Sequence, residues 1–593
     1  MAPARRVSHL CLSATIVLML ASARGAGSAP RPAEDEVRAM QVFVADSLTK
    51  VMREPEQGER PLEEGAARIS AGRNERESFQ VVVIAGVRPR RNVTVAVSAL
   101  KQERGRGMIP ASRVTVNPVG YVETREPAYQ VERVGWWPDP LMPPGPVTVK
   151  PGQRQPFWVT VHVPDTAAAG LYRGAITVHA DGLADREIPL EVKVWDFTLA
   201  PTSPLPSAIA IQPEILSRFY HQYPIAETTL RSYWNMLFTH RLSSDDVGDP
   251  LPDGMGAVID GRSRGPVDFA AFDKRLEYCF PRGLTAFQAA RLPGFQDKGP
   301  DLQLDQQERV VSYLGDLAGH LDSRGWLDRA FVMVWDEPRD RRAQQVLKEL
   351  QVIHRANPRL RARLDGPVTG PLVELCDKEV DIWGLHMLNV AHGGVQAEAN
   401  LARWRREGRT LWMYVACDVH HPYPNLFVDY PLIDCRVLPW MNWRYDIGGF
   451  LYWSAVWFGD ENLKGDEPEA KWPNRPWVAG TYVSEWEGKR QVFNGDGQFV
   501  YPGPNGTALS SVRLEALRDG MEDYEYLSLL EKGLDMLEKA KLAPDLVAEG
   551  RAWLASQQVV RSFTDWTHDA ETVFTTREQL ASLIERVYQA ALR

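Results

Sequence analysis

The sequence predicts a multidomain protein with an N-terminal antiparallel β-sandwich, a (β/α)8 TIM-type barrel and a helical C-terminal tail. At 593 residues the chain is too long for one ordinary core. Strand-like runs bounded by Gly and Pro fill its first third, and from about residue 206 strands alternate with helices. We divide the chain into a signal peptide (1–23), a sandwich domain (36–200), a barrel (206–533) and a helical extension (534–593).

The N-terminus has the three parts of a secretory signal peptide. Arg5 and Arg6 form a basic region, residues 10–20 an apolar region, and residues 21–23 a small-residue cleavage site. The apolar run of roughly 11 residues is too short to span a bilayer. We therefore expect an exported protein, periplasmic or extracellular, whose mature chain does not insert into the membrane.

The sandwich is predicted from short runs of β-branched and aromatic residues. Residues 78–84, 157–163 and 175–178 are such runs. In 190–194 apolar and charged residues alternate, which is typical of a strand with one buried and one solvated face. A proline-rich linker follows at 201–206.

The barrel is predicted from a repeated strand–helix alternation. Apolar residues recur at helical steps in 310–321, a buried strand follows at 331–335, and another helical stripe occupies 346–353. A doubly wound open sheet is the alternative, but no G-x-G-x-x-G follows a first strand. Eight strands are expected, the second poorly defined: 209–211, near 240, 284–289, 331–335, 361–364, 381–387, 411–417 and 450–455.

The charge of the chain narrows the possible partners. The net charge is −9, and the sequence contains no basic tract. Nucleic-acid binding requires clustered Lys and Arg, so we expect no nucleic-acid partner. The sequence gives no indication of the oligomeric state.

Neither cysteine nor histidine spacing indicates a metal or a cofactor. The four cysteines after the signal peptide are far apart, without a C-x-x-C pair. Cys417 and Cys435 fall in neighbouring barrel elements, where a disulfide is one interpretation, but buried free thiols are the preferred one. His420 and His421 are adjacent with Asp418, yet adjacent side chains on an extended loop point apart, so no metal is expected.

Two adjacent acids are the sharpest local feature. The hydrophobic strand at 331–335 ends in Asp336 and Glu337, and Pro338, which lacks an N–H, stops the ladder. The C-terminal ends of barrel strands form the active-site face. Adjacent carboxylates repel when both are ionised, so one of them is expected to keep its proton near neutrality. The structural alternative is a helix cap or an ion pair with Arg339.

The adjacency of the acids also bears on mechanism. Ordinary glycosidases place two carboxylates about 5–5.5 Å or about 6.5–9.5 Å apart across the sugar. Neighbours on one strand do not easily straddle a glycosidic bond. They suit a substrate whose own 2-acetamido oxygen is the nucleophile, with one acid protonating the leaving oxygen and the other stabilising the acetamido group.

Further candidates for substrate binding come from other strand ends. The Tyr414 hydroxyl is a candidate donor to an acetamido carbonyl, and the indoles of Trp453 and Trp457 are suited to stacking on a sugar ring. His386 and Asn389 follow another strand and are candidates for binding sugar hydroxyls. A purely structural role in the core is the alternative for each of them.

A cluster of charges is expected on the long C-terminal helix that begins near residue 510. Its members are predicted to form an ion-pair network that holds the helix, with the alternative that one of them reaches the active site: Arg513, Arg518, Asp519 and Glu522.

Five motifs in order resemble glycoside hydrolase family 123 and the larger, mostly uncharacterised group related to it. They cover nearly the whole mature chain: 74–80, 135–141, Trp-Asp-Glu-Pro at 335–338, Gly495-Asp496-Gly497 with 501–503, and 513–527. The resemblance implies release of N-acetylgalactosamine from glycans by the acetamido-assisted route. It makes Glu337 the general acid/base and Asp336 the residue that orients and stabilises the acetamido group.

Two other functions compete with this one. A glycosidase for a sugar without an acetamido group would need a separate nucleophile, for which Asp365 at the end of the strand 361–364 is the first candidate. A glycan-binding protein without turnover is the non-enzymatic alternative, and the intact acid pair is evidence against it.

Overall fold

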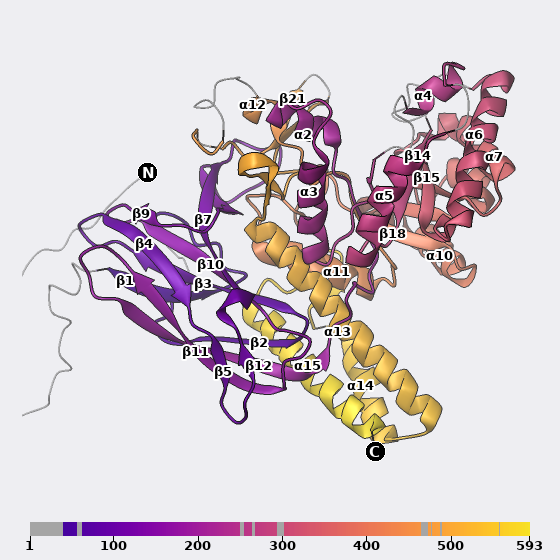
Figure 1. The fold of residues 1–593 in the computed structure, drawn as a ribbon. Helices are drawn as coiled ribbons and strands as arrows, with labels where there is room; N and C mark the ends of the chain where they lie inside the picture. Colours follow the sequence, from indigo (N-terminus) through magenta and orange to yellow (C-terminus); the bar gives the residue numbers. More distant parts are fainter. Residues whose placement is uncertain are drawn as a thin grey trace, which may run out of the picture.

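The computed structural model describes residues 40–55, 62–248, 254–263, 267–292, 302–463, 472–475, 477–486, 489–556 and 558–592, with side chains left undescribed at 481–490. The predicted signal peptide, residues 1–23, lies outside these residues. The β-sandwich and the barrel lie side by side, and the C-terminal helices run along the boundary between them (Figure 1). The predicted fold class is confirmed.

Two sheets form the sandwich, and their facing sides enclose a core of Val, Ile, Leu and Phe side chains. In β12, Leu190, Val192 and Val194 are buried, whereas Glu191 and Lys193 are not, as the alternation predicts. The first sheet has the order β1 (Gln41–Asp46), β3 (Arg76–Ile84), β10 (Arg154–His162), β7 (Val114–Glu123), β8 (Trp136–Leu141). The second has the order β2 (Ala67–Arg73), β12 (Arg186–Thr198), β11 (Gly170–His179), β4 (Arg90–Val97), β9 (Val147–Val149); β5 (Leu100–Gln102) pairs with β11, and β6 (Met108–Ile109) pairs with β5.

The barrel sheet contains seven parallel strands. Their order is β13 (Ser207–Ile209), β19 (Phe450–Tyr452), β18 (Thr410–Tyr414), β17 (Ile382–His386), β16 (Arg361–Gly366), β15 (Ala330–Trp335), β14 (Phe287–Arg291). Every residue of β15 and β17 is buried, as expected for parallel strands covered on both faces.

The eighth position of the barrel is occupied by a short extended segment, 243–245. Ile209 N donates to Ser243 O (3.0 Å) on one side, and Gln288 N donates to Asp245 O (2.9 Å) on the other. The segment therefore joins β13 to β14 where the sequence indicated a poorly defined strand. With it counted, β15 is the fourth strand of the barrel.

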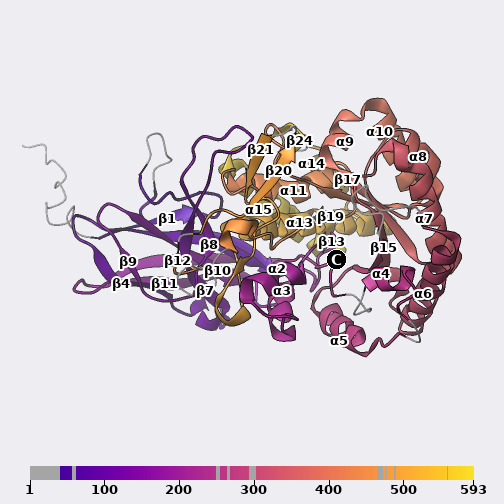
Figure 2. The same ribbon diagram turned by 90° about the horizontal axis from the view of Figure 1, so that it is seen from above.

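Helices cover the outside of the barrel (Figure 2). The predicted stripes at 310–321 and 346–353 lie in α6 and α7, and their apolar residues face the core. The helices from β13 to β19 are α2 (Pro213–Tyr220), α3 (Glu227–Thr239), α4 (Gly254–Ile259), α5 (Ala270–Cys279), α6 (Leu304–Ser323), α7 (Ala343–Ala356), α8 (Pro371–Cys376), α9 (Met387–His392), α10 (Gly394–Arg406) and α11 (Leu432–Arg444).

The segment after β19 reaches from the barrel to the sandwich. The end of β7 and the loop after it hydrogen-bond to this segment: Ala479 N donates to Glu123 O (2.8 Å), and Ala128 N donates to Val492 O (3.0 Å). The segment contains α12 (Gly459–Asn462), the hairpin β20 (Thr481–Trp486) and β21 (Lys489–Asn494), and the pair β22 (Tyr501–Pro502) and β23 (Ala508–Leu509).

Long helices complete the chain. They are α13 (Val512–Ala540), α14 (Pro544–Ser556) and α15 (Ala570–Ala591), with β24 (Val560–Ser562) and β25 (Asp565–Trp566) between the last two. The predicted boundary at residue 533 falls inside α13, which continues from the barrel into the extension as one helix. Among the residues described, no helix is long and apolar enough to cross a membrane.

The predicted ion-pair network on α13 is confirmed, and it extends into the sandwich. Arg513 pairs with Asp139 of β8 (2.7 Å), and Arg518 pairs with Glu515, Asp519 and Glu522. These side chains are buried. Arginines from other elements join the same cluster: Arg241 with Glu522 and Glu525, Arg436 with Asp519 and Asp523, and Arg577 with Glu75, Glu77 and Asp523.

Candidate active site

Asp336 and Glu337 follow the last residue of β15 on the C-terminal face of the barrel. The strand end is anchored by Trp335, whose Nε1 donates to the buried Glu349 Oε2 of α7 (2.7 Å). Asp336 is half-buried and Glu337 is exposed. The acid pair is therefore held by a buried strand, and of the two acids Glu337 is the one exposed to solvent.

Glu337 has a left-handed backbone, with φ +48°. Its N–H donates to Asp365 O at the end of the neighbouring strand β16 (3.2 Å). Gly366 follows, and a Cβ added there would lie 3.0 Å from Glu337 Cα. A non-glycine residue in this region is uncommon and persists where its surroundings hold it. The end of β16 thus fixes the direction of the Glu337 side chain.

Tyr414, the last residue of β18, donates its hydroxyl to Glu337 Oε1 (2.6 Å). The tyrosine is 5% exposed. Burial, together with the charges of Glu337, Asp365 and Asp336, raises the pKa of Tyr414 well above its ordinary value. The phenol is therefore a neutral donor that orients the Glu337 carboxylate.

Asp336 lies in surroundings that favour its protonated form. Burial, and then the negative charges of Asp365 and Glu337, raise the pKa of Asp336 to about 7. Arg363 and Arg291 act in the opposite direction. The sequence predicted that one member of the pair would retain a proton near neutrality. In the structure, the burial of Asp336 and its neighbouring carboxylates favour this residue as the protonated one.

Asp365 is held as a counterion within the barrel. It is 3% exposed, and its two carboxylate oxygens accept from Arg363 Nε (2.8 Å) and Nη2 (2.6 Å). Arg363 also contacts Asp245 (3.3 Å) in the segment that closes the barrel. A carboxylate bound at both oxygens to a buried guanidinium is poorly suited to attack a substrate.

His386 and Asn389 lie beside this group but have partners of their own. His386 is buried, its Nε2 lies 3.0 Å from Asp418 Oδ1, and its ring packs edge-on against Tyr414 at 5.0 Å between centroids. Asn389 is exposed on α9 and donates Nδ2 to Gly366 O (2.8 Å). Both residues therefore support the strand ends that hold Glu337.

Trp453 and Trp457 follow β19, the neighbour of β18. Both indoles are half-buried, with ring centroids 5.4 Å apart and ring planes at 54°. Trp453 Nε1 donates to Asp496 Oδ1 (3.3 Å). Burial, and then the charges of Asp496, Asp418 and Glu337, raise the pKa of the Cys417 thiol.

The structure joins five of the seven predicted site residues in one group. Contacts among Glu337, Tyr414, His386 and Asn389 run through the ends of β16 to β18, and Asp336 is adjacent. Arg363 and Gly366 were not predicted to belong to the site. Arg363 could have been recognised from the sequence, because an arginine within a buried strand needs a partner. The close approach of Gly366 to Glu337 has no signature in the sequence.

The residues weighed as metal ligands have separate partners. His420 Nε2 contacts Cys417 O (2.7 Å), and His421 Nε2 contacts Asp434 Oδ2 (2.8 Å). Within the described ranges no three His, Cys, Asp or Glu side chains are grouped to hold a metal ion. Cys417 and Cys435 are free thiols.

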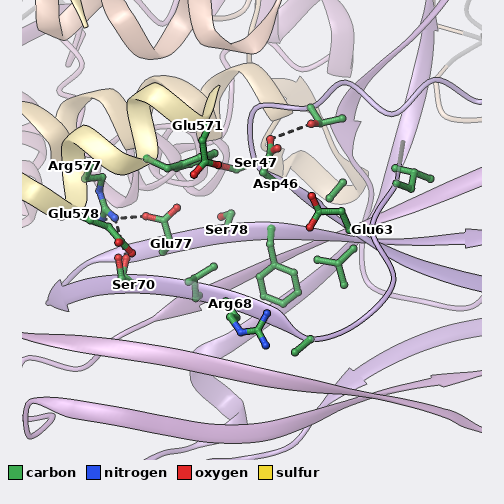
Figure 3. A pocket seen from close by; sticks show the side chains of 18 residues that line it. Asp46, Ser47, Glu63, Arg68, Ser70, Glu77, Ser78, Glu571, Arg577 and Glu578 are labelled. Carbon is green, nitrogen blue, oxygen red and sulfur yellow. Dashed lines mark hydrogen bonds and ion pairs between the residues drawn. The ribbon is translucent and has the colours of Figure 1, made fainter. Parts of the chain in front are cut away.

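A separate cavity of about 290 Å³ lies between the sandwich strands β1 to β3 and α15 (Figure 3). None of the predicted site residues lines it. Glu77 and Arg577 at its floor pair with each other (3.1 Å) and belong to the ion-pair network between the domains.

Two family models and one solved structure match the chain closely. The catalytic domain of glycoside hydrolase 123 matches residues 305–530, and its N-terminal domain matches residues 50–180. A family 123 glycoside hydrolase from Clostridium perfringens, analysed for glycolipid glycan hydrolysis, superposes with a TM-score of 0.65 at 14% identity, covering 93% of this chain and 99% of that one.

Another solved structure matches with a lower score. A Bacteroides ovatus GH5 xyloglucanase in complex with a XXXG heptasaccharide has a TM-score of 0.31 at 8% identity, covering 77% of this chain and 98% of that one. Among curated proteins, none matches the chain in sequence. The two family models together cover more than half of the chain and include the acid pair, and the chain belongs to glycoside hydrolase family 123.

Proposed function

We propose that this glycoside hydrolase is exported and releases a β-linked N-acetylhexosamine from glycans with retention, using the 2-acetamido group of its substrate as the nucleophile. N-acetylgalactosamine is the favoured sugar. The observation that carries the proposal is the pair Asp336 and Glu337 on one strand end. One acid is exposed and oriented by Tyr414, and the other lies half-buried beside it.

In the first step Glu337 donates a proton to the glycosidic oxygen while the acetamido carbonyl oxygen attacks the anomeric carbon. The glycosidic bond breaks, the aglycone leaves as an alcohol, and a positively charged oxazolinium ion that keeps the acetamido N–H forms. In the second step Glu337 takes a proton from water, and the water oxygen opens the oxazolinium ring at the same carbon. Two displacements on one carbon retain its configuration.

Asp336 acts on the other end of the acetamido group by accepting its N–H. A carboxylate there stabilises the positive charge that develops as the oxazoline forms. The pKa of Asp336, raised to about 7, means that the free site retains a proton near neutrality. A positively charged acetamido group beside Asp336 favours the ionised carboxylate, because opposite charges stabilise each other.

The competing mechanism with a protein nucleophile has less support. Asp365, its first candidate, is buried and bound at both oxygens to Arg363. Glu337, by contrast, has one described side-chain hydrogen bond, which it accepts from the neutral hydroxyl of Tyr414.

Aryl β-glycosides of N-acetylgalactosamine, N-acetylglucosamine, galactose and glucose test the proposal. We expect the mature protein to hydrolyse only the two acetamido sugars, and Glu337→Gln to lower the rate by at least about 100-fold on an aglycone that needs protonation. A thiazoline analogue of the oxazoline should inhibit competitively.

Two results would contradict this function. Hydrolysis of plain hexosides with a covalent intermediate trapped by a fluorinated sugar would establish a protein nucleophile. Glycan binding without turnover on extended natural glycans would show a binding protein. Export is tested separately, since N-terminal sequencing of the secreted chain should show cleavage after Ala23.

A further inference from the structure

Asp496 is a buried carboxylate that the proposed reaction does not use. It is 1% exposed, and its Oδ1 accepts from Tyr452 Oη (2.9 Å) and from Trp453 Nε1 (3.3 Å). Within the described part of the chain no Lys, Arg or His forms an ion pair with it. A buried carboxylate without a cation is costly. A specific role for its hydrogen bonds would account for its presence.

Two glycines bring the backbone on either side of Asp496 close to its neighbours. Gly495 has φ +80°, and a Cβ there would lie 2.5 Å from Val428 Cγ2. Gly497 has φ +71°, and a Cβ there would overlap the six-membered ring of Trp453. Gly497 O also accepts from Trp457 N (2.9 Å). The loop therefore packs against the Trp453 indole through Gly497 and accepts the indole N–H through Asp496.

The sandwich domain holds the start of this loop. Asn494 Nδ2 donates to Arg125 O (2.8 Å) in the loop after β7 and to Asp429 Oδ2 (2.7 Å) in the loop after β18. Asn494 N donates to Tyr129 Oη (3.1 Å), and the same hydroxyl donates to Asp429 Oδ1 (2.8 Å). Tyr129, Asp429 and Asn494 are buried. Two loops of the barrel face are thereby joined to one loop of the sandwich.

We propose that Asp496 is a positioning residue that holds the Trp453 indole as a stacking platform for the substrate sugar, and that the sandwich domain fixes this loop through Tyr129 and Asn494. The inference rests on the proposed function, in which a sugar ring is bound at this face. A flat indole fixed in one orientation binds the apolar face of a sugar without the entropy cost of ordering its side chain. The sandwich thus contributes to the geometry of the site instead of acting as a separate module.

The test compares steady-state kinetics of Asp496→Ala, Asp496→Asn and Trp453→Ala with those of the full-length wild type on an aryl β-N-acetylhexosaminide. We expect Asp496→Ala to raise KM about tenfold, the effect of losing one charge-assisted hydrogen bond, while kcat changes little. Asp496→Asn retains a carbonyl acceptor for the indole N–H and should raise KM less. Tyr129→Phe, which removes the hydroxyl that contacts Asn494 N and Asp429 Oδ1, should also raise KM.

The double variant Asp496→Ala/Trp453→Ala separates positioning from a general effect on folding. If Asp496 acts through Trp453, its removal adds little to the KM of Trp453→Ala. Fully additive effects, or a wild-type KM in Asp496→Ala, would overturn the inference. Thermal unfolding followed by circular dichroism identifies variants that are not folded, and Asp496→Asn is then the variant compared.

Failure of the proposed function is distinguishable from failure of this inference. A wild-type protein that hydrolyses no acetamido sugar contradicts the function. The positioning role is then decided by the affinity of wild type and Asp496→Ala for the same sugar, measured by calorimetry. Equal affinities, or no binding by wild type, overturn the inference as well.

Discussion

At the scale of single residues, the site depends on two neighbouring carboxylates in different surroundings. Glu337 is exposed and receives a hydrogen bond from Tyr414, whereas Asp336 is half-buried near Asp365. Placing like charges close together raises the cost of ionising both. The difference in surroundings is a physical basis for giving two adjacent acids different roles.

The raised pKa of Asp336 predicts a pH dependence. As the pH rises through about 7, Asp336 loses its proton and becomes able to accept the acetamido N–H, so kcat/KM should rise. In Asp336→Asn the rate should fall by at least about 100-fold, and the residual activity should lack this acidic limb. The measurement is kcat/KM from pH 5 to about pH 9. Near-wild-type turnover by Asp336→Asn would contradict the acetamido-assisted mechanism.

Tyr414→Phe gives a second prediction for a single residue. The substitution removes the hydroxyl that orients Glu337 and leaves the buried ring in place. We expect kcat to fall about 10- to 100-fold, because the proton donor is no longer held in line with the leaving oxygen. Unfolding temperature should change little. An unchanged kcat would show that the hydrogen bond has no part in the reaction.

At the scale of elements, the turn after β15 depends on the end of β16. Glu337 is left-handed, its N–H is bound to Asp365 O, and Gly366 leaves room for its Cα and Cγ. Gly366 itself has φ +107°, a conformation that favours glycine. The position of Glu337, the proposed general acid, is thus set by an element about 30 residues further along the chain.

Gly366→Ala is predicted to affect both stability and catalysis. A Cβ there would lie 3.0 Å from Glu337 Cα, so the turn must shift, and we expect a loss of about 1–3 kcal/mol in stability together with a large loss of kcat. Gly408→Ala is the control. This glycine has φ +73°, and no atom lies within 4 Å of a Cβ added there. It precedes β18 and therefore lies on the face of the barrel opposite the candidate site. It should cost stability without loss of kcat. Equal kcat values in the two variants would contradict the role assigned to Gly366.

At the scale of the whole molecule, the two domains and the C-terminal helices are joined by buried charges. Arg577 of α15 pairs with Glu75 and Glu77 of the sandwich and with Asp523 of α13. Removing one partner from such a network leaves a buried charge uncompensated. Burial, the largest cause in each case, raises the pKa of Glu75 to about 7 and the pKa values of Glu77 and Glu525 to about 8.

This network predicts that the protein loses stability as the pH rises from about 4.5 to about 8. Between pH 4.5 and about 8 the folded chain retains a proton on Glu77 that the unfolded chain has lost, so the free energy of unfolding falls as the pH rises through this window. Glu77→Gln should flatten the decrease in unfolding temperature between pH 6 and pH 9. Glu549→Gln, at an exposed pair with Arg586, should leave it unchanged. A wild-type unfolding temperature that rises over this range would contradict the account.

The sequence by itself determined the features that depend on local patterns. Alternation in 190–194 indicated a half-buried strand, helical steps indicated α6 and α7, and a hydrophobic strand ending in Asp336 and Glu337 placed the acid pair. These patterns have periods of two or of three to four residues, so neighbouring residues are enough to show them.

The tertiary structure decided the contacts between distant segments. Several of these contacts are hydrogen bonds within the candidate site. Tyr414 binds Glu337, Arg363 binds Asp365, and Asp496 binds Trp453. The closing segment 243–245 is likewise recognised only by the strands on its two sides. Such pairings depend on the order and register of strands around the barrel, which no local period in the sequence records.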